Sequence, residues 1–216
     1  YAPAPETAVH TFCHAVPNRW YQMGVMLSAT DSLNWLSGIV GAKPADLTAA
    51  LGDDPVAPGK TRFLPYLSGE RTPHNDAVIR GGFTGLGTDT TREDMTRAVL
   101  EGVAFALRDN FDALTATGAR FDGLIAIGGG TRSHYWLRMI ATVLGVPLHL
   151  PAGGEFGAAL GAARLAICAA TGADPQEVME GPALGRQIDP VAGLRAPFED
   201  GYARFRAAYP LIRQAQ

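Results

Sequence analysis

The chain has 216 residues, which is enough for one large domain or two small ones. Apolar residues make up 47% and charged residues 18%, a composition that excludes a disordered chain, and no apolar run approaches the ~18 residues of a membrane span. The net charge of −3 is small and the basic residues are scattered, which argues against a nucleic-acid partner.

The chain opens with extended segments and continues with short helices. Residues 9–14 and 21–27 alternate or run apolar on either side of a Pro-Asn turn, so we expect them to pair as a β-hairpin. A helix is predicted over residues 30–39, with Ser28 and Thr30 as candidate side-chain caps. A second, shorter helix is expected just after it, over about seven residues behind a proline.

A long polar segment, residues 68–82, then interrupts the regular pattern. Its sequence, SGERTPHNDAVIRGG, is too rich in polar and turn-forming residues for a core element, and loops of this length in a compact domain are often functional. Glu70, Arg71 and Asp76 offer acid–base chemistry, but an ion pair that stabilises the loop is the commoner arrangement.

The second half of the chain alternates between helices and strands. Helices are predicted at residues 90–117, 133–144, 157–171 and 198–213, and buried strands at residues 123–127 and 146–150. Thr90 and Glu93 are expected to form a capping box at the start of the longest helix. This alternation predicts a single α/β domain, without internal repeats, that contains at least one parallel strand pair.

The strand, glycine-rich turn and helix that span Leu124 to Leu144 are the first candidate for ligand binding. The turn is Gly128-Gly129-Gly130, where the absence of β-carbons allows the backbone to approach a ligand closely. The start of the helix offers N–H groups and partial positive charge to a phosphate. Ser133 is placed either to cap this helix or to contact the ligand, and a tight turn without any ligand is an equally good interpretation.

Other nucleotide motifs fit this unit less well. A P-loop is excluded because no Gly-Lys-Ser/Thr follows the glycines. A dinucleotide fingerprint requires a third glycine where Ser133 stands, although Glu155 follows the next strand as a candidate ribose-binding acid. An NAD site is therefore a weak alternative, and the small residues after Glu155 are more simply explained by helix–sheet packing.

The remaining reactive side chains indicate no separate metal site or catalytic centre. His10 and His14 lie in a predicted strand without a third ligand, and Cys13 and Cys168 lack the spacing of metal ligands or of a disulfide framework. No nucleophile elbow or hydrolase triad is present. We therefore expect no metal ligand in the chain and a reducing, cytoplasmic environment.

The chain resembles the C-terminal half of the FGGY carbohydrate kinases. The family's second signature prescribes small, apolar and acidic or amide residues at fixed spacing, and it is satisfied here by Gly81, Phe83, Gly85, Leu86, Asp94, Met95, Ala98, Val99, Leu100 and Glu101. The run FLPYLSGERTPHND, residues 63–76, is similar to the version of this loop in the xylulokinase branch of the family. The resemblance covers nearly the whole chain and fades after about Ala170.

This resemblance implies a ribonuclease-H-like (actin-like ATPase) domain, with a mixed sheet flanked by helices, over residues 1–216. Such a domain would be the C-terminal, nucleotide-binding domain of a two-domain kinase. The implied nucleotide contacts are Gly129 and Gly130 against the adenosine, with Ser133 and His134 close by. The resemblance also implies that Thr30 and Asn34 reach the phosphates and the adenosine.

The implied activity is phosphorylation of D-xylulose to D-xylulose 5-phosphate with ATP and Mg²⁺. Another sugar or polyol kinase of the family (ribulokinase, gluconokinase or glycerol kinase) and a non-catalytic nucleotide-binding module remain alternatives. The family's catalytic aspartate and its Gly-Thr phosphate turn are expected upstream of Tyr1, so no catalytic residue is assigned to this chain. The expected partners are the family's N-terminal domain, the sugar and a second copy in a homodimer, with no nucleic acid and no membrane.

Overall fold

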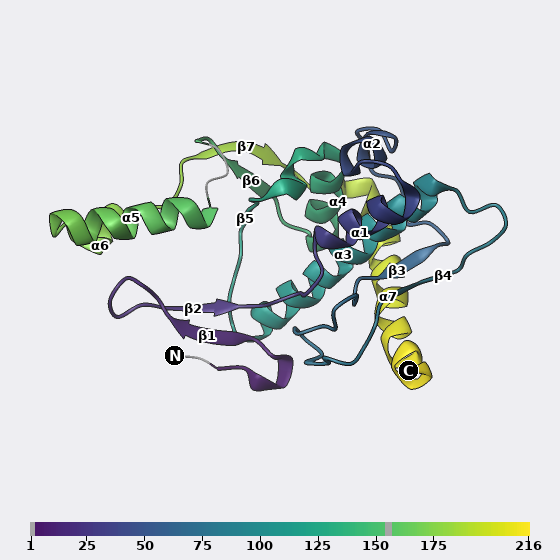
Figure 1. The fold of residues 1–216 in the computed structure, drawn as a ribbon, viewed down its shortest axis with the longest axis horizontal. Coiled ribbons are helices and arrows are strands. Elements are labelled where there is room, and N and C mark those ends of the chain that lie inside the picture. Colours follow the sequence, from purple (N-terminus) through teal and green to yellow (C-terminus); the bar gives the residue numbers. More distant parts are fainter. Residues whose placement is uncertain (1–2, 154–156) are drawn as a thin grey trace.

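A long central helix organises the fold in a computed structural model, which describes residues 3–153 and 157–216. Helix α3 (Arg92–Ala116) packs against a short two-stranded sheet, against the helices before and after it, and against the C-terminal helix (Figure 1). The other α-helices of the described residues are α1 (Asp31–Val40), α2 (Pro44–Ala49), α4 (His134–Leu144), α5 (Gly157–Thr171), α6 (Pro175–Val178) and α7 (Arg195–Ala215).

The strands form three small sheets in the described part of the chain. Their bounds are β1 (His10–Cys13), β2 (Trp20–Met23), β3 (Arg62–Leu64), β4 (Gly82–Thr84), β5 (Leu124–Ile125), β6 (Leu148–Pro151) and β7 (Leu184–Ile188). The pairs β1–β2 and β3–β4 are antiparallel, whereas β6 lies between a parallel β5 and an antiparallel β7. The predicted hairpin, the parallel pair and the mixed α/β sheet are thus confirmed.

The predicted capping box at the start of α3 is wrong by one residue. Thr91 Oγ1 accepts a hydrogen bond from the Asp94 N–H at 3.1 Å, and Asp94 Oδ2 accepts one from the Thr91 N–H at 3.1 Å. Thr90 Oγ1 instead accepts a bond from the Gly87 N–H at 2.9 Å, in the turn before the helix. The adjacent threonines give the same sequence signal, and the preceding turn decides which one caps.

The predicted side-chain caps of α1 are also not formed. The N-cap position is Thr30, whose backbone already has helical φ and ψ angles of −59° and −25°, and its side chain makes no cap hydrogen bond. Ser28 contributes its carbonyl oxygen, which accepts a bond from Ser32 Oγ at 2.6 Å. The helix therefore begins without using the Thr30 hydroxyl.

Two apolar clusters hold these elements together. In the larger one, Val99, Leu100 and Val103 of α3 are at most 1% exposed and pack among β3, α1, α4 and α7. The smaller one joins α4 to the three-stranded sheet, where Leu148 of β6 and Ile188 of β7 are each 3% exposed. Burial at these positions supplies the main stabilising free energy of the fold.

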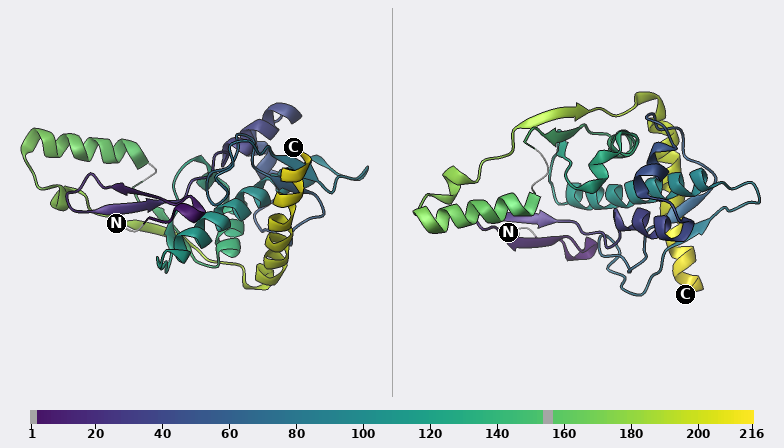
Figure 2. Two further views of the ribbon diagram at one scale, coloured as in Figure 1. Left: turned by 90° about the horizontal axis from the view of Figure 1, so that it is seen from below. Right: turned by 45° about the horizontal axis from the view of Figure 1, so that its top comes forward.

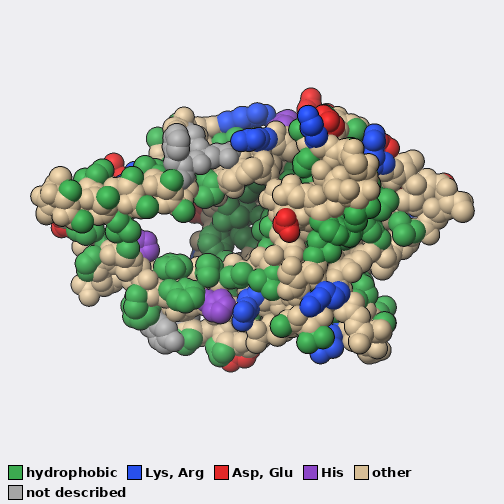
Figure 3. Space-filling view, in the orientation of Figure 1, with side chains coloured by type: hydrophobic (Ala, Val, Ile, Leu, Met, Phe, Trp, Pro, Cys, Tyr) green, Lys and Arg blue, Asp and Glu red, His purple; other side chains and the backbone are tan. Residues whose placement is uncertain are grey.

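Helix α5 contributes no residue to either cluster. Helix α5 has no buried residue and extends away from the body above the β1–β2 hairpin (Figures 1 and 2). Its Leu160, Leu165 and Ile167 are exposed, and the space-filling view shows an opening between this helix and the hairpin (Figure 3). Among the helices of residues 3–153 and 157–216, none combines the length and apolar character that crossing a membrane requires.

Candidate functional site

A cleft of about 710 Å³ lies where α1, α2 and the glycine turn meet. Its lining includes all six residues that the sequence analysis singled out, namely Thr30, Asn34, Gly129, Gly130, Ser133 and His134. The two halves of this set are almost a hundred positions apart in the sequence. They come so close that a β-carbon built on Gly130 would lie 3.7 Å from Thr30 Oγ1.

The glycine turn has a backbone conformation that favours glycine. Gly128 has a φ of +97°, in the region that residues with a β-carbon rarely adopt. Its carbonyl oxygen accepts bonds from the N–H and Oγ1 of Thr131 at 3.1 and 2.7 Å, which close a 3₁₀ turn over Gly129–Arg132. The preceding strand β5 covers only Leu124–Ile125, so it is shorter than the strand predicted at residues 123–127.

The other two glycines of the turn have different surroundings. A β-carbon on Gly130 would lie 3.2 Å from the ring of Trp136, which is buried and donates a hydrogen bond from Nε1 to the Leu100 carbonyl at 3.1 Å. A β-carbon on Gly129 would meet nothing within 4 Å. Gly130 is therefore restricted by packing, whereas the backbone of Gly129 is open to a bound molecule.

Ser133 and His134 mark the start of α4 at the cleft. Ser133 Oγ accepts a hydrogen bond from the Trp136 N–H at 3.2 Å, so of the two roles left open for this residue the structure shows the cap. The ring of His134 lies 3.0 Å from Nη2 of Arg186, which belongs to β7. This arginine places a positive charge beside the cleft residue His134.

Several lining residues of the cleft were not predicted from the sequence. Lys43 and Thr48 come from the region of α2, Asp53 from the loop after it, and Arg132 from the glycine turn. Lys43 and Arg132 add positive charge that suits an anionic ligand. Arg132 could have been predicted from the sequence, because it follows the glycines closely. No local pattern marks Lys43 or Asp53 as lining residues.

The competing site hypotheses find no support in the described residues. Glu155, the candidate ribose-binding acid, lies outside them. His10 belongs to β1 and His14 follows that strand, and no group of three or more metal-ligating side chains is found in residues 3–153 and 157–216. Asp76 does pair with an arginine, but the partner is Arg213 of α7, at 2.6 Å.

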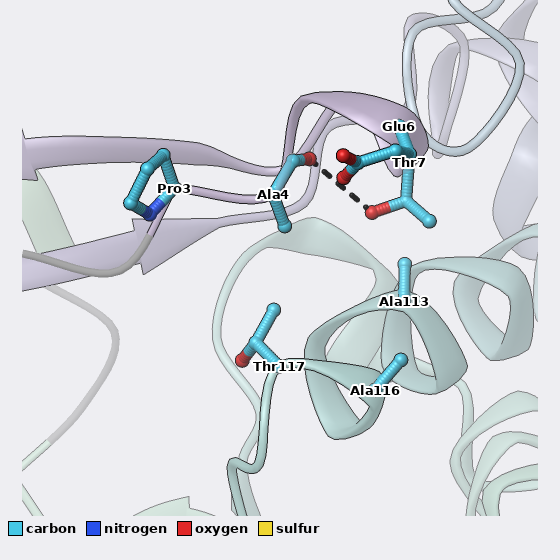
Figure 4. A pocket seen from close by; sticks show the side chains of 7 residues that line it. All are labelled: Pro3, Ala4, Glu6, Thr7, Ala113, Ala116 and Thr117. Carbon is cyan, nitrogen blue, oxygen red and sulfur yellow. Dashed lines mark hydrogen bonds between the residues drawn. The ribbon is translucent and has the colours of Figure 1, made fainter.

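A second hollow, of about 250 Å³, lies at the opposite end of α3 (Figure 4). It is formed where the N-terminal 3₁₀ turn (Pro5–Thr7) faces Ala113, Ala116 and Thr117. Thr7 Oγ1 donates to the Ala4 carbonyl at 3.4 Å, so the hydroxyl serves the turn. Its described lining includes none of the predicted site residues, and the carboxylate in that lining, Glu6, is exposed to solvent.

Comparison with known proteins identifies the family. Residues 2–170 match the model of the C-terminal domain of the FGGY family of carbohydrate kinases. The chain belongs to this family. Of the signature residues, Gly81 precedes β4, Phe83 lies on it, Gly85 and Leu86 lie in the turn after it, and the remaining six lie on the first three turns of α3. Ala98, Val99 and Leu100 are at most 1% exposed and belong to the larger apolar cluster, and none of the signature residues lines the cleft.

Individual relatives agree with this assignment. The chain is 49% identical over 168 residues to the xylulose kinase of Escherichia coli K12, an alignment that covers 77% of this chain and 34% of the relative. A crystal structure described as a xyloylose kinase from Brucella ovis matches with a TM-score of 0.93 and 54% identity, over 100% of this chain and 45% of that one. The crystal structure of the xylulose kinase from Rhodospirillum rubrum matches with a TM-score of 0.80 and 30% identity, over 96% of this chain and 43% of that one.

These likenesses confirm the predicted fold class, an actin-like ATPase (ribonuclease-H-like) α/β domain with a mixed sheet and flanking helices. The chain spans about a third of the length of its curated E. coli relative and less than half of the two solved structures. The family match ends at residue 170, so α6, β7 and α7 lie beyond it.

Proposed function

We propose that this chain is the nucleotide-binding half of an ATP-dependent xylulokinase, which converts D-xylulose to D-xylulose 5-phosphate. The observation that carries the proposal is the single cleft that collects six residues from two distant segments in a chain of the FGGY family. The names of two relatives support D-xylulose as the sugar, because the proteins from E. coli and Rhodospirillum rubrum are both described as xylulose kinases.

The cleft has the features that a nucleotide requires. The backbone at Gly129 lies open to a ligand, and the capped N-terminus of α4 presents partial positive charge to an anion. The hydroxyl of Thr30 and the amide of Asn34 supply polar contacts from α1, and Lys43 and Arg132 supply positive charge. We assign Gly129 and Gly130 to the adenosine, with Ser133 and His134 beside it, and Thr30 and Asn34 to the phosphates and adenosine.

The chemical step requires groups beyond these. In-line phosphoryl transfer needs a base for the sugar hydroxyl, and we place this aspartate in the family's N-terminal domain. Mg²⁺ would accompany ATP and neutralise charge on its phosphates. Asp53 is the one carboxylate among the described residues that line the cleft, so we assign no metal ligand to this chain and expect Mg²⁺ to be held mainly by the phosphates.

The chain exposes apolar surfaces that are suited to contacts with other protein domains. Figure 3 shows hydrophobic side chains on both sides of the opening between α5 and the hairpin. In these elements Leu165 and Phe12 are 43% and 41% exposed. Patches of this kind commonly mark protein contacts. We propose that the N-terminal domain of the kinase is one partner and a second copy, in a cytoplasmic homodimer, another; sedimentation of the full-length enzyme tests the dimer.

An assay of the full-length protein tests the proposed function. We expect ADP release that depends on D-xylulose, with kcat/KM at least about tenfold higher than for D-ribulose or glycerol, because a missing or misplaced hydroxyl leaves polar groups of the site unpaired. A clear preference for glycerol or D-ribulose would replace xylulokinase by another kinase of the FGGY family. Nucleotide binding without transfer to any sugar would favour a non-catalytic module instead.

Gly129→Val is expected to raise the KM for ATP about tenfold or more while the KM for D-xylulose changes little, because a branched side chain would occupy the space of an approaching nucleotide. Steady-state kinetics of the full-length variant with each substrate varied in turn measures both constants. Gly38→Val, at an exposed position of α1 with no atom within 4 Å, is the matched control. An unchanged KM for ATP would mean that the open side of Gly129 does not face the nucleotide.

A further inference from the structure

The loop over residues 68–76 is fastened to the chain segment that enters the cleft. That segment, residues 24–29, runs from the β1–β2 hairpin to the start of α1, where Thr30 and Asn34 lie. It belongs to no helix or strand, so its position depends on contacts with its neighbours. Two buried side chains of the loop, Glu70 and Thr72, supply such contacts.

Glu70 holds the end of the segment that is nearer the cleft. Its side chain is 2% exposed, and its Oε1 accepts hydrogen bonds from the Leu27 N–H at 3.1 Å and from the Arg71 N–H at 2.8 Å. Burial raises the pKa of this carboxyl to about 7, although both hydrogen bonds act in the opposite direction. A buried carboxyl that is fixed by two backbone donors is an unusual and costly way to hold a loop, which suggests a specific role.

Thr72 holds the same segment two residues earlier. Its N–H donates to the Val25 carbonyl at 2.9 Å, and its Oγ1 accepts from the Val25 N–H at 3.0 Å. The segment also lies against α3, because a β-carbon on Gly24 would be 2.6 Å from Oδ1 of Asn110. The segment is therefore confined between α3 and the loop.

The loop itself is fixed at its other end. Glu70 and Asp76 exchange two backbone hydrogen bonds, each 2.8 Å long. The Asp76 carboxylate accepts a bond from the Tyr209 hydroxyl at 3.0 Å and pairs with Arg213 at 2.6 Å, both on α7. Glu70 therefore acts from a rigid support, and a change at its carboxyl is expected to move the segment rather than the loop.

Two residues, Ser28 and Ala29, separate the anchored Leu27 from the cleft residue Thr30. After Leu27 the chain passes through Ser28, which is 1% exposed and whose carbonyl accepts the bond from Ser32 Oγ that begins α1. Thr30 follows at the helix N-cap, with its hydroxyl 3.7 Å from the β-carbon position of Gly130. Release of the Leu27 N–H would thus alter the spacing between α1 and the glycine turn, across which the ligand must fit.

We propose that Glu70 is a positioning residue of the nucleotide cleft, which holds Leu27 so that Thr30 and Asn34 face the glycine turn at the correct separation. The inference rests on the proposed function, because it takes the ligand of the cleft to be a nucleotide. Glu70 touches no lining residue of the cleft by a hydrogen bond of its own and acts through the backbone of residues 27–30.

The test compares two substitutions of Glu70 in the full-length protein. Glu70→Ala is expected to raise the Kd for ADP, measured by calorimetry, about tenfold and to speed hydrogen exchange at the Leu27 amide by a similar factor. Glu70→Gln keeps an acceptor oxygen at the same place and should restore both values to within about threefold. The KM for D-xylulose should stay within about twofold in either variant.

Two further variants separate positioning from a general loss of stability. Thr72→Val removes the acceptor for the Val25 N–H without a change of shape and should raise the Kd for ADP about threefold even if Glu70→Ala does not fold. Asp109→Ala alters another buried carboxyl, which accepts a hydrogen bond from the Tyr202 hydroxyl of α7 at 2.7 Å, and should leave that Kd unchanged.

Folded Glu70→Ala and Thr72→Val proteins that bind ADP as tightly as the wild type would overturn the inference. So would a Glu70→Gln variant that is as impaired as the alanine variant, because the acceptor position would then not be what matters. A wild-type protein that binds ADP but transfers no phosphate to D-xylulose would overturn the proposed function alone. The comparison of the variants would still decide the role of Glu70.

Discussion

Gly102→Ala is expected to lower the free energy of unfolding by about 3 kcal/mol, because the added methyl group has no space. Gly102 lies in α3, and an ideal β-carbon there would be 2.2 Å from the carbonyl oxygen of Phe63 and 3.1 Å from its carbonyl carbon. Phe63 belongs to β3, is fully buried, and pairs with Phe83 of β4. A backbone oxygen in such a place cannot rotate away, so the helix and the sheet would have to separate.

The direction of this effect is diagnostic, because helix propensity alone predicts the opposite. Alanine is favoured over glycine by about 1 kcal/mol in a helix interior. Gly38→Ala in α1 is the control, since no atom lies within 4 Å of its β-carbon position, and it should raise stability by up to about 1 kcal/mol. Urea denaturation of both variants measures the difference. A Gly102→Ala protein as stable as Gly38→Ala would contradict the close packing of α3 on β3.

The fold could be predicted as far as its patterns are local. The long helical periodicity around Val99 predicted α3, and the strand–turn–helix order predicted the parallel pair of β5 and β6. The close contact of Gly102 with β3 could not be predicted, since Gly102 and Phe63 are 39 positions apart in the sequence. Strand β7 (Leu184–Ile188) was missed because four of its five residues are exposed, so it carries no clear apolar pattern.

The candidate site shows the same division. The glycine turn and the start of α4 were predicted from elementary properties, namely backbone access and the charge at a helix N-terminus. Thr30 and Asn34 were identified only through the family resemblance, because nothing local connects α1 to the turn. Lys43 was missed altogether, since its place in the cleft depends on how α2 packs.

Burial of acidic side chains was the least predictable property, although it has large consequences for stability. Glu101, the last residue of the FGGY signature, is 2% exposed and accepts one hydrogen bond, from the Gly59 N–H at 3.3 Å. The Arg97 guanidinium lies 3.8 Å away and makes a much shorter pair with Asp94, at 2.6 Å. Burial therefore outweighs the attraction between Arg97 and the Glu101 carboxylate, and it raises the pKa of Glu101 from its ordinary value near 4.5 to about 8.

The sign of the resulting pH dependence follows from proton binding in the two states. Between the ordinary pKa and the raised one, the folded protein holds a proton on Glu101 that the unfolded chain has lost. The contribution of this proton to the free energy of unfolding is fully present below pH 4.5. It is lost as the pH rises towards 8, at up to about 1.4 kcal/mol per pH unit. Glu70 and Asp109, whose pKa values burial raises to about 7 and about 6, act in the same direction.

Glu101→Gln is accordingly expected to flatten the pH dependence of stability. Between pH 5.5 and pH 7.5 the wild-type free energy of unfolding should fall by about 2 kcal/mol more than that of the variant, because glutamine has no proton to lose over this range. Urea denaturation at the two pH values measures the difference. Glu93→Gln, at the exposed start of the same helix, should keep the wild-type slope, since the pKa of Glu93 is lowered and its titration lies below this range. Equal slopes for Glu101→Gln and Glu93→Gln would mean that Glu101 is already ionised in the folded protein, and that Arg97 compensates for its burial after all.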